Sequence, residues 1–221
     1  MQTKKAVIWD LDGTLLDTLQ DLTAAVNFAL TQGGYPVRTI HEVRAFVGNG
    51  VAKLIERAMP AGASAQQVAE ALAVFRQYYA VHSVDVTAPY EGIPAGLEAL
   101  RDAGVKMAVV SNKLEPAVEA LRQRFFADTI AVAAGDVPTR PAKPAPDSTL
   151  WAMEQLGVTA EETLFVGDSE VDILTARHAG VDCLAVSWGF RDKECLLGQG
   201  AAAVADTPAE AFAWIHNWLK G

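Results

Sequence analysis

The chain has 221 residues, of which 51% are hydrophobic and 20% are charged, and its formal net charge is -9 at pH 7. Because nucleic-acid binding needs a concentrated Lys/Arg surface, this acidic balance argues against a nucleic-acid partner. Charges interrupt every apolar run before it reaches the length of a membrane span, and the start MQTKK lacks the apolar segment of a signal peptide. We therefore expect a cytoplasmic protein with no membrane partner, in one domain or in one domain with a smaller one inserted.

The first predicted element is a buried parallel strand at residues 6–9, AVIW, which is apolar throughout and does not alternate. Asp10 and Asp12 follow it at once, and Gly13 and Thr14 come next. Open α/β sheets place their ligand crevices at the carboxyl ends of their strands. Two carboxylates at such an end indicate a site rather than a polar loop.

Residues 16–87 are predicted to form an all-helical cap domain inserted into an α/β core of residues 1–15 and 88–221. The apolar spacing and the Gly/Pro breaks in this block favour helices at 17–32, 40–46, 51–59 and 65–82. Asp17 fits the start of the first helix, and no chemistry is assigned to it.

The remainder alternates strands with helices. Strands are expected at 105–110, 130–134, 163–166 and 183–186, with helices between them, a small edge strand within 201–205 and a terminal helix at 208–219. This order predicts an open, mainly parallel, Rossmann-like sheet with helices on both faces.

Polar residues follow three of the expected strands. Because the carboxyl ends of parallel strands share one edge of a sheet, these residues can converge despite their separation in the chain. Four carboxylates brought together would repel one another unless a cation lay among them, and an all-oxygen site suits Mg²⁺. A cation and a lysine would then attract a phosphate group. The residues are Asp10 and Asp12, Ser111 and Asn112, Asp168 and Asp172, with Lys143 in the loop before the last pair.

These residues occur as Asp-x-Asp-Gly-Thr, Ser-Asn, Lys-Pro and Gly-Asp-Ser-x-x-Asp, in that order. The series resembles the four motifs of the haloacid dehalogenase-like superfamily of phosphotransferases. The resemblance implies that Asp10 attacks phosphorus to form an aspartyl-phosphate, and that Asp12 exchanges protons with the leaving group and water. Dehalogenases, which attack carbon, lack an acid at this second position, so Asp12 favours phosphoryl transfer.

The same resemblance implies the other roles. Mg²⁺ would be bound by Asp10, by Asp12 through its backbone carbonyl, and by Asp168. Asp172 would contact these ligands without touching the ion, or would bind the ion through water. The phosphoryl group would be held by Ser111, Asn112 and Lys143. Lys113 is interpreted as a surface residue or a charge behind the site.

Within the cap, Gly48, Asn49 and Gly50 are candidate substrate contacts, because two glycines permit a close backbone approach; a plain turn is the competing interpretation. The stretches VGNGVAKLIERAM, WAMEQLG, FVGDSEVDI and SWGF resemble phosphoglycolate phosphatases. This favours a small phosphorylated metabolite as the partner, with 2-phosphoglycolate first. Lys53 and Arg57 could meet a substrate carboxylate, although a solvated helix face explains them as well. We expect a monomer or homodimer.

Three alternatives stay open. A sugar phosphomutase similar to β-phosphoglucomutase would return the phosphoryl group to the sugar. A phosphonate hydrolase would need a cap lysine for a Schiff base, and Lys53 is the one lysine in the cap. A regulatory protein would bind phosphate without turnover. Cys183 and Cys195 have no metal-ligand spacing, so they are predicted to be reduced and structural, and the four histidines show no paired spacing that would bind a metal.

Overall fold

The computed structural model describes residues 4–221, and the chain divides into two compact units. One unit is Leu16–Ala88, and the other comprises the described chain up to Leu15 and from Pro89 onward. The second boundary between the units lies one residue beyond the boundary predicted from the sequence. Both boundaries lie at short strands, β2 (Leu16–Asp17) and β3 (Ala88–Pro89), which pair with each other.

The larger unit contains a six-stranded sheet in the order β5-β4-β1-β6-β7-β8. Each neighbouring pair is parallel, and β1 at the centre is fully buried because its four residues are all apolar. The predicted Rossmann-like sheet is confirmed. Its strands are β1 (Ala6–Trp9), β4 (Lys106–Leu114), β5 (Val132–Asp136), β6 (Thr163–Gly167), β7 (Asp182–Val186) and β8 (Val204–Ala205).

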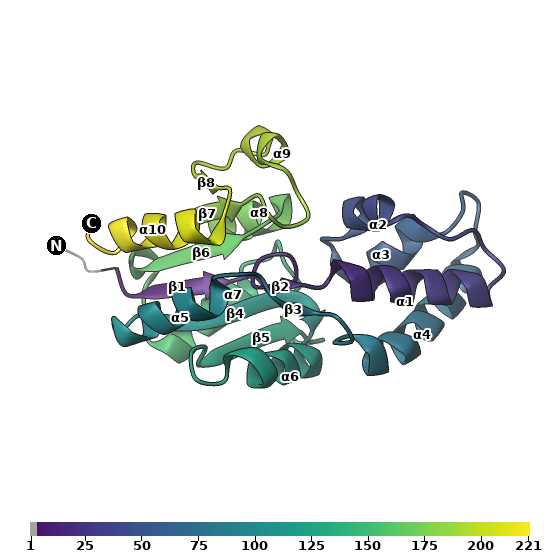
Figure 1. Ribbon diagram of the computed structural model, residues 1–221, viewed down its shortest axis with the longest axis horizontal. Helices are drawn as coiled ribbons and strands as arrows, with labels where there is room; N and C mark the ends of the chain where they lie inside the picture. The colour runs from purple at the N-terminus through teal and green to yellow at the C-terminus, as the bar shows by residue number, and fades with distance from the viewer. Residues whose placement is uncertain (1–3) are drawn as a thin grey trace. The chain divides into compact units, whose positions relative to one another are not determined.

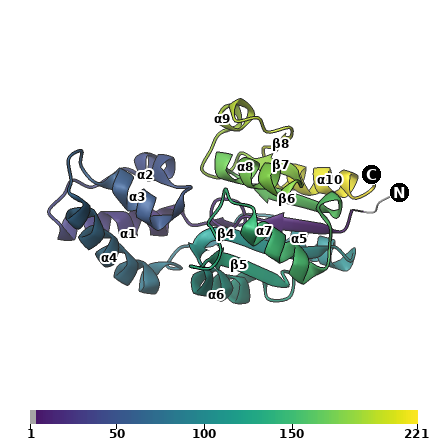
Figure 2. The same cartoon turned by 180° about the vertical axis from the view of Figure 1, so that it is seen from behind.

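Helices cover both faces of this sheet. Figure 1 looks onto the face that carries α5 and α10, and Figure 2 onto the face that carries α7 and α8. The indole of Trp9 in β1 lies 5.6 Å from the ring of Phe212 in α10, so the first face has an aromatic core. The helices are α5 (Ile93–Asp102), α6 (Glu115–Phe126), α7 (Asp147–Leu156), α8 (Glu170–Ala179), α9 (Lys193–Gly198) and α10 (Pro208–Trp218), with a short 3₁₀ turn at Ala160–Glu162.

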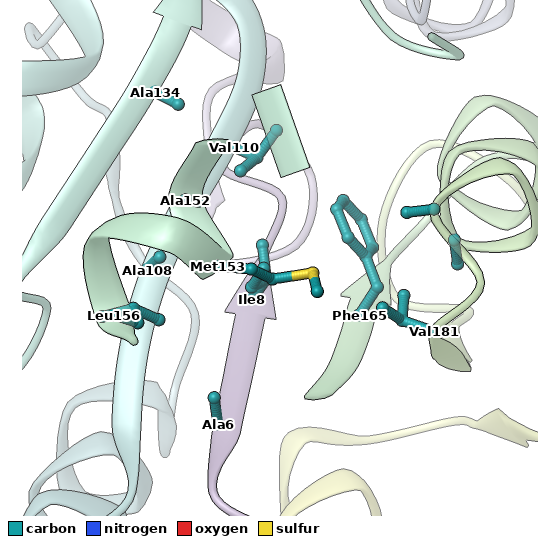
Figure 3. Packing of buried hydrophobic residues seen from close by; sticks show 12 residues of the cluster. Ala6, Ile8, Ala108, Val110, Ala134, Ala152, Met153, Leu156, Phe165 and Val181 are labelled. Carbon is teal, nitrogen blue, oxygen red and sulfur yellow. The ribbon is translucent and has the colours of Figure 1, made fainter. Parts of the chain in front are cut away.

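The opposite face is packed by alternate residues of the strands against α7 and α8. Figure 3 shows Met153 of α7 beside Ile8 of β1 and Phe165 of β6, and all three belong to one buried cluster. Since Ile8 and Trp9 point to opposite faces, burial on both sides requires an unbroken apolar run. This packing fixes β1, and with it the position of the carboxylates that follow.

The smaller unit is all helical: α1 (Leu19–Gln32), α2 (Ile40–Phe46), α3 (Gly50–Ala58) and α4 (Ala65–His82). Thr39 and Ser64 begin α2 and α4 with reciprocal capping boxes to Glu42 and Gln67. Asp21 in the first turn of α1 is buried, and it accepts hydrogen bonds from the backbone N–H groups of Val86 and Thr87 and from the Thr87 hydroxyl. The partners of this buried carboxylate are thus neutral donors.

Several boundaries differ from those predicted. The first helix starts at Leu19 instead of residue 17, because Leu16–Asp17 pair as a strand. Strand β4 continues to Leu114, where the polar run Ser111-Asn112-Lys113 had predicted a loop. Helix α9 was not predicted. No helix within residues 4–221 combines the length and apolar character that a bilayer crossing needs. Cys183 and Cys195 are free thiols, as predicted.

Candidate active site

The site is built on the carboxyl ends of the central strands. Asp10 directly follows β1, and its backbone N–H donates to the carbonyl of Val166 in β6 (2.8 Å). The backbone of Asp10 is thereby fixed to the neighbouring strand. Oxygen atoms of Asp10, Asp168 and Asp172 all lie within 4.8 Å of one another, so residues about 160 positions apart meet at one edge.

Lys143 enters this cluster from the loop before α7. Its ammonium group lies 2.6 Å from Asp10 and 2.7 Å from Asp172. The three side chains are nearly solvent-free, with exposed fractions of 4%, 10% and 2% for Lys143, Asp10 and Asp172. Beneath them, the ring of Phe165 lies 5.5 Å from the ammonium group. Water therefore does little to screen these charges from one another.

The pKa values of the cluster reflect this enclosure. Burial raises the pKa of Asp10 to about 7, with Lys143 opposing the shift and Asp172 adding to it. Burial also raises the pKa of Asp168 well above its usual range, and the carboxylates of Asp10 and Asp172 add to the shift. For Lys143, burial lowers the pKa, but attraction to Asp10 and Asp172 outweighs it and the net shift is upward. The acids are thus crowded, and the lysine stays charged.

Asp168 follows β6 and is fixed by two donors. The Thr14 hydroxyl donates to one oxygen (3.2 Å), and the backbone N–H of Phe190 donates to the other (2.6 Å). The Trp188 indole N–H also donates to the carbonyl of Thr14 (3.1 Å). The strip Ser187–Phe190 thus ties the loop after β1 to Asp168.

Gly13 makes this close approach possible. Its φ is +90°, and a Cβ at this position would lie 2.9 Å from the ring of Phe190. Any other residue would both strain the backbone and push Phe190 away from Asp168.

Asp172 lies in the first turn of α8. One of its oxygens accepts from the backbone N–H (3.1 Å) and the hydroxyl (2.6 Å) of Ser169, which closes a capping box. Its other oxygen faces Lys143. Asp172 therefore holds the ammonium group of Lys143 beside Asp10.

Asn112 braces Lys143 through the backbone. Its side-chain oxygen accepts from the Lys143 N–H (2.8 Å), and its side-chain N–H donates to the Lys143 carbonyl (3.0 Å). The phosphate contact expected for Asn112 stays a prediction. Ser111, also expected to bind phosphate, is buried and accepts a hydrogen bond from the Lys113 N–H (3.2 Å).

Lys113 is not a surface residue, which corrects one of the two interpretations given to it. Its side chain is 6% exposed, and its ammonium group lies 2.8 Å and 3.0 Å from the two carboxylate oxygens of Asp12. The error followed from the predicted loop, since a lysine in a loop is normally solvated. Strand β4 instead continues through Lys113 and carries it beside the loop after β1.

A second ion pair was also missed. Arg140, three residues before Lys143, pairs with Glu115 at the start of α6, and its guanidinium carbon lies 4.3 Å from the centre of the Trp151 ring. This pair ties the Lys143 loop to the end of β4. The one signal of this pair in the sequence was an arginine within the proline-rich stretch at residues 138–146.

The candidate cap residues form a local network in the helical unit. Gly48 and Gly50 have positive φ values, 135° and 78°, as close turns require. Arg57 donates to the carbonyl of Phe46 and to the side-chain oxygen of Asn49, both at 2.7 Å. Lys53 pairs with Glu56 on the surface of α3. Arg57 thus anchors the turn at Asn49.

The cluster Asp10, Asp168 and Asp172 has the chemistry of a divalent-cation site. The three groups offer oxygen donors within 4.8 Å, and a cation among them would offset the burial and repulsion that raise the pKa values of Asp10 and Asp168. The residues therefore fit such an ion. Asp12, expected to contribute its backbone carbonyl, directs its side chain to Lys113.

Comparison with known proteins agrees with this geometry. Residues 7–186 match the model of the haloacid dehalogenase-like hydrolases. The phosphoglycolate phosphatase of Pseudomonas savastanoi pv. phaseolicola is 37% identical over 213 residues, which cover 91% of this chain and 76% of that protein. The same figures hold for phosphoglycolate phosphatase 1 of Pseudomonas aeruginosa.

Among solved structures, the crystal structure of a Lactobacillus delbrueckii subsp. bulgaricus protein superposes with a TM-score of 0.93 at 36% identity, covering 97% of this chain and 99% of that one. A family match that spans most of the chain, together with relatives above 30% identity, establishes the relationship. The chain belongs to the haloacid dehalogenase-like hydrolase family.

Proposed function

We propose that this protein is a Mg²⁺-dependent phosphatase that hydrolyses 2-phosphoglycolate through an aspartyl-phosphate on Asp10. The observation that carries the proposal is the buried cluster in which Lys143 lies 2.6 Å from Asp10, with Asp168 and Asp172 beside it. A lysine and a cation site flanking one carboxylate supply the positive charge that attracts a dianionic phosphate.

Asp10 is the proposed nucleophile because its backbone is pinned to β6 and its side chain is held by Lys143. Asp168 and Asp10, with the backbone carbonyl of Asp12, would hold the Mg²⁺. The ion would supply charge stabilisation to the phosphoryl oxygens. Covalent attachment to Asp10 divides one difficult displacement into two easier ones.

The other residues have supporting roles in this proposal. Lys143 and Ser111 hold the phosphoryl oxygens, and Asn112 and Asp172 hold Lys143 in place. Asp12 gives its proton to the leaving alkoxide and later takes a proton from the attacking water. The cap contacts of Gly48, Asn49 and Gly50 stay predictions.

The substrate is inferred from the relatives named phosphoglycolate phosphatases, which align with 91% of this chain. The test is release of inorganic phosphate from a panel of phosphorylated metabolites at fixed Mg²⁺, ranked by kcat/KM. We expect 2-phosphoglycolate to rank first, and EDTA or Asp10→Asn to abolish release. Activity that survives both changes would exclude the mechanism, and another metabolite at the head of the panel would exclude the substrate.

Lys193→Met is a surface control for the substitution in the buried cluster. Lys193 also pairs with an aspartate, Asp206, at 2.6 Å, but its side chain is 51% exposed on the surface. It should leave phosphate release unchanged. Interconversion of glucose 1-phosphate and glucose 6-phosphate without phosphate release would instead identify a phosphomutase.

A further inference from the structure

Lys113 and Asp12 form a largely buried ion pair, and Asp12 lies two residues after the proposed nucleophile Asp10. The ammonium group contacts both carboxylate oxygens, at 2.8 Å and 3.0 Å, and the side chains are 6% and 16% exposed. The two residues are 101 positions apart and reach each other because β1 and β4 are neighbours in the sheet. The pair is therefore a product of the fold and not of local sequence.

Stability alone is a poor explanation for this pair. Removing a lysine and a carboxylate from water costs roughly what their attraction returns, so a buried ion pair adds little net stability compared with an apolar pair. Its position beside Asp10 points to a role in the reaction.

The backbone around Lys113 is shaped to place it there. Strand β4 loses its regular register with β5 between Val110 and Leu114, and the Lys113 N–H turns back to the Ser111 hydroxyl. On the facing strand, a Cβ at Gly135 would lie 2.7 Å from the Lys113 carbonyl oxygen. A glycine at this point lets the irregular end of β4 approach β5 and direct Lys113 toward Asp12.

The two buried lysines of the site serve different acids. Lys143 contacts Asp10 and Asp172, whereas Lys113 contacts Asp12. The carboxylate that is proposed to attack phosphorus and the one that is proposed to handle the proton thus each have their own cation.

We propose that Lys113 is a positioning residue for Asp12: it aims the carboxyl group and stabilises the negative charge that Asp12 gains on giving up its proton. This rests on the proposed function. In the step concerned, a bond forms between Asp10 and phosphorus as the bond from phosphorus to the leaving oxygen breaks. That oxygen takes the proton that Asp12 gained from water in the previous turnover. Asp12 then returns to the carboxylate form that pairs with Lys113, and Lys113 keeps all its protons.

The test compares leaving groups. A phenolate departs without a proton, whereas an alkoxide needs one, so a defect at Asp12 should depend on the leaving group. Four substrates separate this role from binding of a substrate carboxylate. Two have alkyl leaving groups, 2-phosphoglycolate and ethyl phosphate, and two have aryl leaving groups, 4-carboxyphenyl phosphate and phenyl phosphate. The first substrate of each pair carries a carboxylate and the second does not. Lys113→Met should lower kcat by about 100-fold on both alkyl substrates and by less than about tenfold on both aryl ones.

Two further variants keep the result interpretable if Lys113→Met is unstable. Lys113→Arg keeps the charge and should recover most of the alkyl activity. In an Asp12→Asn background, Lys113→Met should cause no additional loss, because its effect acts through Asp12. Lys193→Met again serves as the control.

Equal losses on all four substrates, losses that follow the substrate carboxylate, or additive losses in the double variant would each overturn the role of Lys113 while the wild-type enzyme remained active. A wild-type protein that releases no phosphate from any of the four substrates would instead overturn the proposed function, and this role with it.

Discussion

Asp10 in the sheet unit and Asp21 in the helical unit are both buried aspartates, yet their partners differ in kind. Asp21, 4% exposed, is surrounded by backbone N–H groups and the Thr87 hydroxyl. Asp10, which is 7% exposed when the whole residue is counted, faces Lys143 and two further carboxylates. Neutral donors satisfy a carboxylate and stabilise the fold around it, whereas crowded charges leave it close to a change of protonation. The comparison distinguishes an acid with a structural environment from the proposed nucleophile.

The sharpest test of this comparison is Asp10→Asn. Removing the proposed nucleophile should lower kcat by about 10⁴-fold or more. The asparagine oxygen can still accept from Lys143, and one of the crowded charges is gone. The free energy of unfolding in EDTA at pH 8, measured by urea titration, should therefore be no lower than that of the wild type. A large fall in stability would mean that Asp10 is a structural acid like Asp21.

Asp21→Ala should show the opposite pattern. The buried donors of Thr87 would lose their acceptor, at an expected cost of about 2 to 4 kcal/mol in the free energy of unfolding. Below the unfolding transition, kcat should stay near the wild-type value. Glu56→Ala, which removes the exposed partner of Lys53 in the same unit, is the control and should cost less than about 1 kcal/mol. A stable Asp21→Ala protein would contradict the structural role.

The pKa of Asp10 gives the comparison a pH dependence. Because the pKa is about 7 in the folded protein and near 3.8 when unfolded, the folded state binds more protons between these values. This group's contribution to stability is therefore fully present below pH 3.8 and is lost as pH rises through about 7. The stability of the wild type relative to Asp10→Asn, measured in EDTA, should fall by at least about 1 kcal/mol from pH 5 to pH 8. Saturating Mg²⁺ should reduce this fall, and a difference that is flat with pH would contradict the assigned shift.

The sequence was sufficient to predict the residues that converge, because that prediction depends on topology. Apolar runs identify strands, parallel strands share an edge, and Asp10, Asp168 and Lys143 meet there as expected. The same reasoning predicted the sheet and the helices of the inserted unit.

The partners of these residues were not predictable in this way. Lys113 was assigned to a loop, because three polar residues in succession normally end a strand, whereas here β4 continues past them. Asp21 received no role, because helix periodicity does not reveal that two backbone N–H groups 65 and 66 residues later will need an acceptor. Long-range pairs of polar groups depend on side-chain geometry, which local patterns do not encode.

The smallest expected effect concerns Arg57, whose two 2.7 Å hydrogen bonds hold the turn at Asn49. Arg57 is on the surface of the helical unit, so Arg57→Met should lower the free energy of unfolding by less than about 1 kcal/mol. If the turn contacts substrate, releasing Asn49 should raise KM for 2-phosphoglycolate several-fold. It should leave kcat unchanged, because the residues proposed for proton and phosphoryl transfer belong to the sheet unit. Lys53→Met, one turn earlier on α3, should change neither value. An unchanged KM would assign Arg57 and the Gly48-Asn49-Gly50 turn to the same purely structural class as Asp21.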